Sequence, residues 1–234
     1  HTSAPENSLA SIRAAAAAGL DFAEVDVRTS SDGVLVLMHD GSVDRTTDGS
    51  GDVGALSYDT LQTLRLRDGG DNPEANRVPR FDEALLLAAR LGIALYVDVK
   101  AVAVEDMAAA LGAGNYLDTA LVRDDAAWVA ELAPRVDGLW SLVPVTSLEE
   151  AEAAREASAT AMVEIASPVA DPALTASLVA AGFRVQQDVM FGGDAPFLLS
   201  GSTDGWRAFV DAGVTVVQSD VPVDLLAWLR SEGR

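Results

Sequence analysis

The sequence contains no cysteine, and this absence excludes several kinds of chemistry. Disulfide frameworks, zinc–thiolate sites and thiol nucleophiles all need that residue. A chain without cysteine suits a reducing or an oxidising compartment, so the sequence leaves both a cytoplasmic and a secreted location open. It also has no apolar run long enough to cross a bilayer, and we expect no transmembrane segment.

Cationic residues are scarce. The 234 residues include 16 Lys and Arg against 36 Asp and Glu, which gives a formal net charge of −20. Nucleic acids and anionic membranes bind basic surfaces, so we expect neither a nucleic-acid partner nor an anionic membrane surface as partner. A small phosphate-containing molecule is repelled as well, unless a metal ion and a few local cations reverse the field at its site.

The remaining composition is typical of one folded domain. Hydrophobic residues make up 49% of the chain and charged residues 22%, which argues against disorder. Neither an internal repeat nor a Gly/Ser-rich linker divides the sequence. We therefore expect a single domain over residues 1–234.

Strand-like apolar runs alternate with helical patterns along the chain. The expected strands are 22–27, 34–38, 93–99, 119–122, 138–143, 160–165, 183–189 and 214–218. The expected helices are 8–18, 81–91, 104–111, 124–132, 147–157, 171–181, 206–212 and 224–230. Nearly continuous Val, Ile and Leu runs are typical of parallel strands buried on both faces. About eight such strands in a chain of this length favour an α/β fold closed as a TIM-type (β/α)8 barrel.

One long segment, residues 41–80, breaks this alternation. It is polar, rich in glycine and without a strand period, and long loops of this kind in compact domains are usually functional. Active sites of TIM-type barrels lie at the carboxyl ends of the strands. Polar residues at those ends are therefore the candidates for chemistry.

The first candidates are Glu24 and Asp26 in the strand 22–27. A spacing of two places both carboxylates on one face, where they repel each other unless a cation lies between them. Carboxylate oxygens suit Mg²⁺ or Ca²⁺. The alternatives are a solvated edge of the sheet, or pairing with Arg28 and Lys100.

Two further strand ends carry candidates. His39 follows the strand 34–38 and is placed for acid/base work, or else is a hydrogen-bonded core histidine. Asp98 and Lys100 share one face at the end of the strand 93–99. Asp98 could complete a metal site and Lys100 could hold a phosphoryl oxygen, or the two could form an internal ion pair.

The fourth candidate is the helix start at Ala4-Pro5-Glu6-Asn7. The free N–H groups at the amino end of a helix favour anions, so Glu6 and Asn7 are candidate substrate-binding residues. The alternative is a capped helix start without a further role.

Each of these signals is weak alone, but their order is specific. The order runs through Pro5-Glu6-Asn7, Glu24-Val25-Asp26-Val27, Met38-His39-Asp40, Arg45-Thr46-Thr47-Asp48-Gly49-Ser50-Gly51, Val78-Pro79-Arg80-Phe81-Asp82-Glu83, Val97-Asp98-Val99-Lys100 and Gln218-Ser219-Asp220-Val221-Pro222. This order closely resembles the glycerophosphodiester phosphodiesterase family. The likeness is dense over residues 4–100 and thin over residues 101–212.

The resemblance implies a barrel in which residues 41–80 are a polar insertion after the His-Asp strand. It implies that Glu24 and Asp26 bind a divalent cation, Mg²⁺ or Ca²⁺, with Asp98 as the third carboxylate. It further implies that His39 is an acid/base residue and that Lys100 contacts the phosphate. Family members usually carry Glu at the position of Asp98, and Asp is shorter by one methylene.

The family also places a His-Arg-Gly motif on a first strand, a few residues before Pro-Glu-Asn. Here only His1-Thr2-Ser3-Ala4 precede that motif. If His1-Thr2-Ser3 were a degenerate copy, Thr would replace the phosphate-binding Arg and no strand would stand in front. We therefore expect the printed sequence to begin after the motif, with the first strand missing and His1 in a loop. The weakest run, 119–122, then lies outside the barrel or is not a strand.

The expected reaction is metal-dependent hydrolysis of a small-molecule glycerophosphodiester to an alcohol and glycerol phosphate. One alternative is a related barrel lyase that acts on lipid headgroups and stops at a cyclic phosphate. The other is a non-catalytic barrel that binds a phosphodiester or a metal. The sequence does not indicate an oligomeric state.

Overall fold

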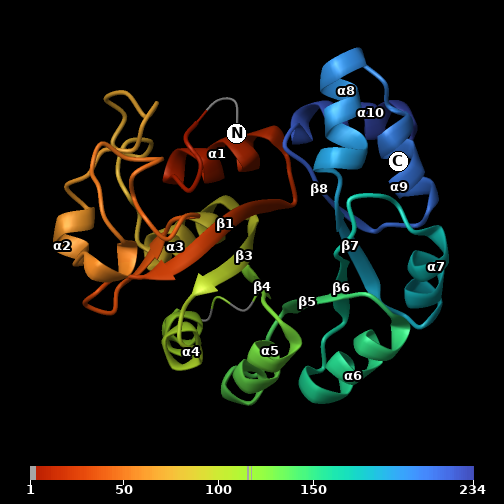
Figure 1. The fold of residues 1–234 in the computed structure, drawn as a ribbon, viewed down its shortest axis with the longest axis horizontal. Coiled ribbons are helices and arrows are strands. Elements are labelled where there is room, and N and C mark those ends of the chain that lie inside the picture. Colours follow the sequence, from red (N-terminus) through yellow and green to blue (C-terminus); the bar gives the residue numbers. More distant parts are fainter. Residues whose placement is uncertain (1–3, 115, 117) are drawn as a thin grey trace. The chain divides into compact units, whose positions relative to one another are not determined.

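The computed structural model describes residues 4–114, 116 and 118–234, and shows strands alternating with helices along the chain (Figure 1). His1 lies outside the described residues. The chain divides into two compact units. Unit 1 comprises residues 1–123 and 134–140, and unit 2 comprises residues 124–133 and 141–234.

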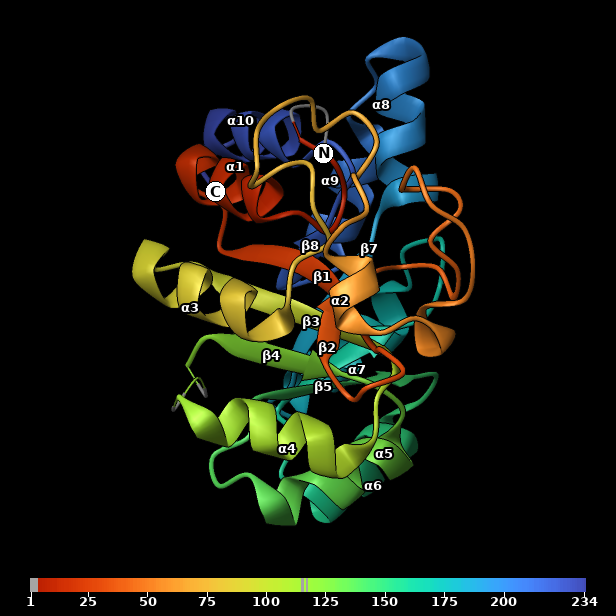
Figure 2. The same cartoon turned by 90° about the vertical axis from the view of Figure 1, so that its left-hand side faces the viewer.

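Unit 1 is built on a sheet of strand order β2-β1-β3-β4. Its strands are β1 (Phe22–Thr29), β2 (Leu35–Leu37), β3 (Ala94–Ala101) and β4 (Ala120–Arg123). Its helices are α1 (Leu9–Ala18), η1 (Val53–Ala55), α2 (Tyr58–Leu61), α3 (Phe81–Leu91) and α4 (Val104–Ala113). The strands β1, β3 and β4 run parallel and lie side by side (Figure 2).

The local sequence explains the elements that lead to the site. The side chain of Ser8 caps α1 by accepting a hydrogen bond from the N–H of Ser11, and Gly19 ends the helix at φ 76°. Val25 and Val97 alternate with acidic residues along β1 and β3 and are fully buried. This period of two turns the acidic side chains to the opposite face.

The structure corrects two expectations and adds detail to a third segment. The run 34–38 gives only the short strand β2, which is antiparallel to β1 because a tight turn with Gly33 at φ 82° returns the chain along the same strand. The run 119–122 gives β4, which pairs with β3, so it is a strand of the sheet. Residues 41–80 contain α2, η1 and a small core in which Val43, Val53 and Leu61 are buried.

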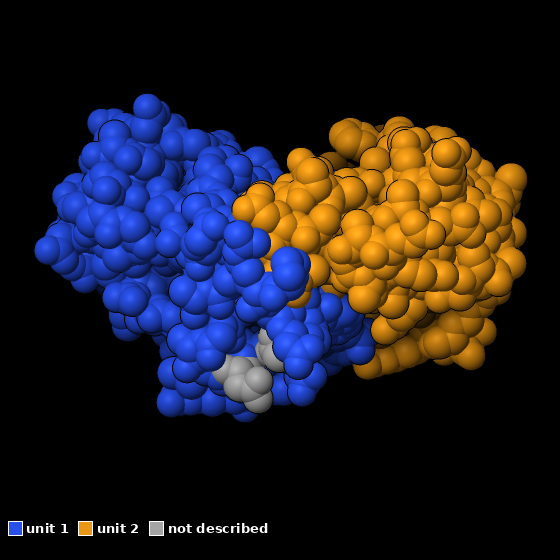
Figure 3. Space-filling model, turned by 90° about the horizontal axis from the view of Figure 1, so that it is seen from below, with its two compact units in different colours: residues 1–123, 134–140 blue, residues 124–133, 141–234 orange. Residues whose placement is uncertain are grey.

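Unit 2, orange in Figure 3, contains four parallel strands in the order β5-β6-β7-β8. They are β5 (Ser141–Val145), β6 (Met162–Ile165), β7 (Arg184–Asp188) and β8 (Val216–Gln218). The helices are α5 (Ala126–Leu132), α6 (Leu148–Ser158), α7 (Pro172–Ala180), η3 (Met190–Asp194), α8 (Ala195–Ser200), α9 (Asp204–Asp211) and α10 (Pro222–Ser231), and the turn η2 (Ala133–Arg135) follows α5. Trp206 and Phe209 of α9 are almost fully buried in a hydrophobic core of unit 2.

The described helices include none that is both long and apolar enough to cross a membrane.

Candidate active site

Three carboxylates meet on one face of the sheet of unit 1. Glu24 and Asp26 lie two residues apart on β1, and the parallel register places Asp26 beside Asp98 of β3. One oxygen of each carboxylate lies within 4.8 Å of the others. The sequence predicted that Glu24 and Asp26 share a face, and the pairing of the two strands brings Asp98 to them.

Asp26 is the best held of the three. Its side chain is buried, and its Oδ2 accepts a hydrogen bond of 2.7 Å from the Nδ2 of Asn7. The N–H of Asp26 in turn donates to the Oδ1 of Asn7 at 2.9 Å. The other carboxylate oxygen, Oδ1, is buried without a hydrogen bond, and the ammonium of Lys100 lies 3.1 Å from it. Asn7, a candidate substrate-binding residue, is therefore engaged in orienting Asp26.

Lys100 links two of the carboxylates. Its Nζ donates to the Oδ2 of Asp98 at 2.7 Å and lies close to Asp26, so the ion pair considered as an alternative is present. Arg123 approaches the same Asp98, with 3.5 Å between Nη1 and Oδ1. Burial alone would lower the pKa of Lys100, but the hydrogen bond and charge of Asp98 and the charge of Asp26 outweigh it and raise that pKa.

Among the described residues, no cation lies as close to Glu24 as Lys100 lies to Asp26 and Asp98. Desolvation by the surrounding protein, followed by repulsion from Asp26 and Asp98, raises the pKa of Glu24 to about 8. Part of the Glu24 side chain still contacts water, which moderates this cost. Glu24 therefore lies beside two carboxylates, both of which are closer to the ammonium of Lys100.

His39 reaches the same region because β2 runs back along β1. The N–H of Met38 donates to the carbonyl of Asp26 at 3.0 Å, which fixes the backbone just before His39. The guanidinium of Arg28 donates to the carbonyl oxygen of His39 at 3.0 and 2.7 Å. The Nδ1 of His39 lies 2.8 Å from the Oδ1 of Asp40, so this histidine is half exposed and hydrogen-bonded, not a core residue.

Glu6 contacts an arginine that the sequence had not singled out as functional. Arg45 forms two hydrogen bonds with Glu6, at 2.8 and 2.6 Å, and two with Asp40, at 2.7 and 3.0 Å. Its position in the Arg-Thr-Thr stretch of the resemblance was the available signal. The pairing itself joins residues 39 positions apart, which no local pattern predicts.

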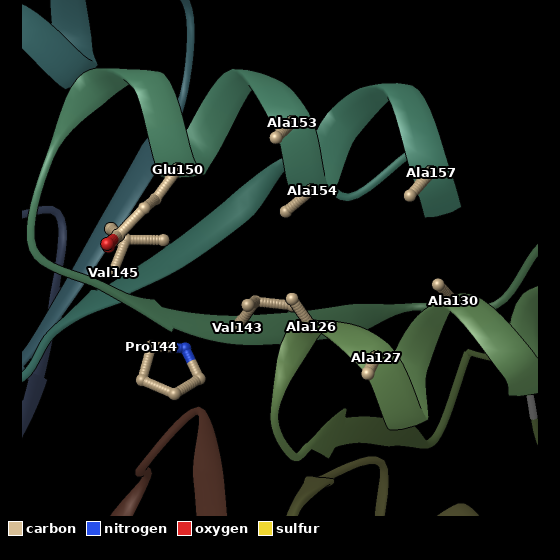
Figure 4. Close-up of a pocket in the computed structure, with 10 residues that line it drawn as sticks. All are labelled: Ala126, Ala127, Ala130, Val143, Pro144, Val145, Glu150, Ala153, Ala154 and Ala157. Carbon is tan, nitrogen blue, oxygen red and sulfur yellow. The ribbon is translucent and has the colours of Figure 1, made fainter.

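A separate hollow lies in unit 2 between α5, α6 and β5 (Figure 4). Its volume is about 400 Å³, and its lining is mostly alanine and valine. The carboxylate of Glu150 belongs to this lining, and its Oε2 accepts from the N–H and the hydroxyl of Thr146. The lining residues thus include no cationic group for a phosphate and no group of acids for a metal.

Comparison with known proteins agrees with the resemblance. The model of the "Glycerophosphoryl diester phosphodiesterase family" matches residues 1–186. Mouse glycerophosphodiester phosphodiesterase 1 is 43% identical over 117 residues, which are 46% of this chain and 33% of that protein. The matched part thus spans about a third of the length of that relative.

Two solved structures share the fold. A glycerophosphoryl diester phosphodiesterase of Parabacteroides distasonis superimposes with a TM-score of 0.82 at 23% identity, over 97% of this chain and 82% of that one. A phosphodiesterase of Oleispira antarctica, solved in complex with the product sn-glycerol-3-phosphate, superimposes with a TM-score of 0.78 at 23% identity, over 98% and 93%. Together with the match to the family model, which covers most of the chain, these results identify the protein as a member of the glycerophosphoryl diester phosphodiesterase family.

Proposed function

We propose that this protein hydrolyses glycerophosphodiesters to an alcohol and glycerol phosphate with the help of a divalent cation. The observation that carries the proposal is the cluster of Glu24, Asp26 and Asp98, three carboxylates within 4.8 Å of one another in a chain of this family. Metal dependence and the substrate both belong to the proposal. Mg²⁺ and Ca²⁺ are the candidate ions, since the donors are all oxygen.

The residues of the cluster fit a hard cation. Asp26 offers a buried Oδ1 without a hydrogen bond, and a carboxylate oxygen each of Glu24 and Asp98 lies within 4.8 Å of an oxygen of Asp26. The bound ion would polarise the phosphoryl group and stabilise negative charge on its oxygens. Without the ion, Lys100 balances part of that charge by pairing with Asp26 and Asp98. Lys100 is then in place to hold a phosphoryl oxygen when its carboxylate partners are occupied.

His39 supplies the proton transfer in this proposal. Its half-exposed ring follows the strand that pairs with the strand carrying Glu24 and Asp26, and histidine is the side chain that most often serves as a general acid or base. Acid/base residues of this kind contribute about 10²–10⁴-fold to turnover. His39→Ala should therefore reduce turnover by about that factor.

We also propose that the chain forms the family's TIM-type barrel, with residues 41–80 as its insertion. The likeness of the fold to solved glycerophosphoryl diester phosphodiesterase structures supports this proposal.

The metal site can be tested without activity. Glu24→Gln combined with Asp26→Asn should abolish the rise in melting temperature caused by Mg²⁺ or Ca²⁺, because ligand binding to the native state stabilises it. Glu149→Gln with Glu152→Gln, on the exposed face of α6, removes the same charge and should leave that rise unchanged. If the Glu24 and Asp26 variant is stabilised like the parent, the ion binds elsewhere.

The reaction is tested by phosphorus NMR of the products. Glycerol phosphate supports the hydrolase. A persistent cyclic phosphate would identify a lyase, and unchanged substrate with saturable binding would identify a binding protein.

A further inference from the structure

Four side chains of unit 1 form a continuous hydrogen-bonded series that ends at His39. Glu6 holds Arg45 through both carboxylate oxygens, Arg45 holds Asp40 through both of its oxygens, and Asp40 contacts the Nδ1 of His39. The series joins the loop before α1 to the loop after β2. Its members are partly exposed, with side-chain exposures between 29% for Asp40 and 54% for His39.

We propose that Asp40, Arg45 and Glu6 are positioning residues that fix the tautomer and the orientation of His39. A carboxylate only accepts hydrogen bonds, so the contact of 2.8 Å places a proton on the Nδ1 of His39. The Nε2 of the neutral ring is then the free acceptor that can take a proton. Neutral imidazole in water mostly carries its proton on the other nitrogen, so the arrangement has to be imposed by Asp40.

Arg45 keeps Asp40 in place for this task. Asp40 is open to water, and a lone carboxylate next to a histidine would rotate among several staggered positions. The fork of the guanidinium fits both oxygens of a carboxylate, which fixes its direction as well as its charge. The hydrogen bond of Arg45, and after it that of His39, holds the pKa of Asp40 well below its usual range, so the carboxylate stays ionised at neutral pH.

Glu6 accepts hydrogen bonds from both Nη atoms of Arg45. In this proposal Glu6 fixes Arg45, whereas the sequence suggested that it contacts the substrate. Arg45 would otherwise carry a free set of N–H donors that could turn toward another acceptor. The carbonyl oxygen of Arg45 also accepts from the Nε of Arg67 at 3.1 Å, which ties its backbone to the same loop region. Exposed ion pairs usually contribute little to stability, so the effect of this series should appear in His39 and not in the melting temperature.

The test is a long-range ¹H–¹⁵N spectrum of the imidazole groups in the full 234-residue chain. The sequence contains two histidines, and a His39→Gln spectrum assigns the signal. The parent should show His39 with its proton on Nδ1. Asp40→Ala should shift the population toward Nε2–H, Arg45→Gln should shift it less, and Glu6→Gln least.

The matched control is Arg13→Gln, which removes an ion pair of the same forked geometry, between Arg13 and Glu74, at 2.6 and 2.9 Å. It should leave the His39 signals as they are in the parent. An unchanged tautomer in a folded Asp40→Ala variant would overturn the proposal, as would equal shifts in Arg45→Gln and Arg13→Gln.

The effect of this positioning on turnover rests on the proposed function. The spectrum tests the positioning of His39 without any assay of the proposed reaction. Arg45→Gln should lower turnover about tenfold or more while the KM changes little, because partners that hold a functional histidine in place typically contribute at least that much to activity. A tautomer shift in an enzyme without diesterase activity would leave the positioning role intact and refute the proposed reaction. Unchanged turnover in Arg45→Gln, in an active parent, would refute the positioning role.

Discussion

Each unit of the chain contains a buried aspartate, and the two are held in opposite ways. Asp194 of unit 2 accepts from the indole Nε1 of Trp206 at 2.7 Å, from the hydroxyl of Ser219 at 2.9 Å and from the N–H of Asp220 at 2.6 Å. Asp26 of unit 1 accepts from Asn7 through one oxygen, and its other oxygen has no hydrogen bond. Each of the two residues exposes at most 2% of its surface to solvent.

The difference separates a structural carboxylate from one available for binding. Neutral donors of its own chain occupy both oxygens of Asp194, so the group organises η3, α9 and the turn after β8. Asp26 has one oxygen that accepts no hydrogen bond, and the ammonium of Lys100 lies 3.1 Å from it. The burial of an acidic residue therefore does not by itself distinguish a structural role from a binding role, and the hydrogen-bond partners of its carboxylate have to be considered as well.

The largest expected effect concerns the structural role of Asp194. Asp194→Ala should lower the free energy of unfolding by about 3 kcal/mol or more, because each buried donor that loses its acceptor costs ~1–3 kcal/mol. Urea unfolding would measure this, with Asp204→Ala as the control at an exposed aspartate that accepts from Ser202. Metal-induced stabilisation should persist in Asp194→Ala. Equal losses in the two variants would mean that the donors around Asp194 find other partners.

The next effect distinguishes the role of Asp98 from that of its ion-pair partner Lys100. Asp98→Ala should weaken divalent-cation binding about tenfold, roughly 1.4 kcal/mol, because one of three anionic ligands is lost. Lys100→Ala should not weaken it, since the ammonium competes with the ion for Asp26 and Asp98. Calorimetric titration of both variants decides this. Similar losses of stability with unchanged affinity would mean that Asp98 serves only as the ion-pair partner of Lys100.

The smallest effect is expected at Asp188, the last residue of β7. Burial, and after it repulsion from Asp220, Asp194 and Glu164, raises the pKa of Asp188 above the usual value of an aspartate. The native state therefore holds this proton more tightly than the unfolded state does. The contribution of Asp188 to stability falls as the pH rises from the pKa of the carboxyl in the unfolded state through the raised pKa of the native state. It stays low at neutral pH.

Asp188→Asn removes this penalty and can keep the hydrogen bond from the N–H of Met190. At pH 7 the variant should be more stable than the parent by less than about 1 kcal/mol. At pH 3 the two proteins should unfold alike, because the carboxyl is protonated in both states. A gain of equal size at both pH values would assign the effect to packing and not to charge.

Much of the fold could be predicted from the sequence, because the periods and helix ends are local. Ser8 and Asp171 cap α1 and α7, and Pro172 begins α7, so the starts of both helices are marked by residues at the start itself. The antiparallel direction of β2 was missed, since it depends on a turn in which the side chain of Ser30 accepts from the N–H of Val34. The run 119–122 was recognised as strand-like but was discounted because four residues give a weak pattern, and only its pairing with β3 places β4 in the sheet.

The spacing of residues alone predicts only the part of the site that one strand contains, and Asp98 was named from its strand end and from the family resemblance. The period of two gave the shared face of Glu24 and Asp26, but the approach of Asp98 depends on the register between two strands. The pairs of Asn7 with Asp26 and of Glu6 with Arg45 link distant positions, so sequence alone suggested contacts with substrate. The roles of these residues, and the single domain over residues 1–234, stay predictions.

Asn7 illustrates how narrow the choice of amino acid can become at one position. Its backbone has φ 53°, a conformation that Gly and Asn adopt most readily. Its amide must also accept from the N–H of Asp26 and donate to the carboxylate of the same residue. Gly lacks the amide, Asp lacks the donor and Gln is longer by a methylene. In a library randomised at this codon, selection for an ordered Asp26 should return asparagine almost alone, although the residue lies in a loop and touches no strand by its backbone.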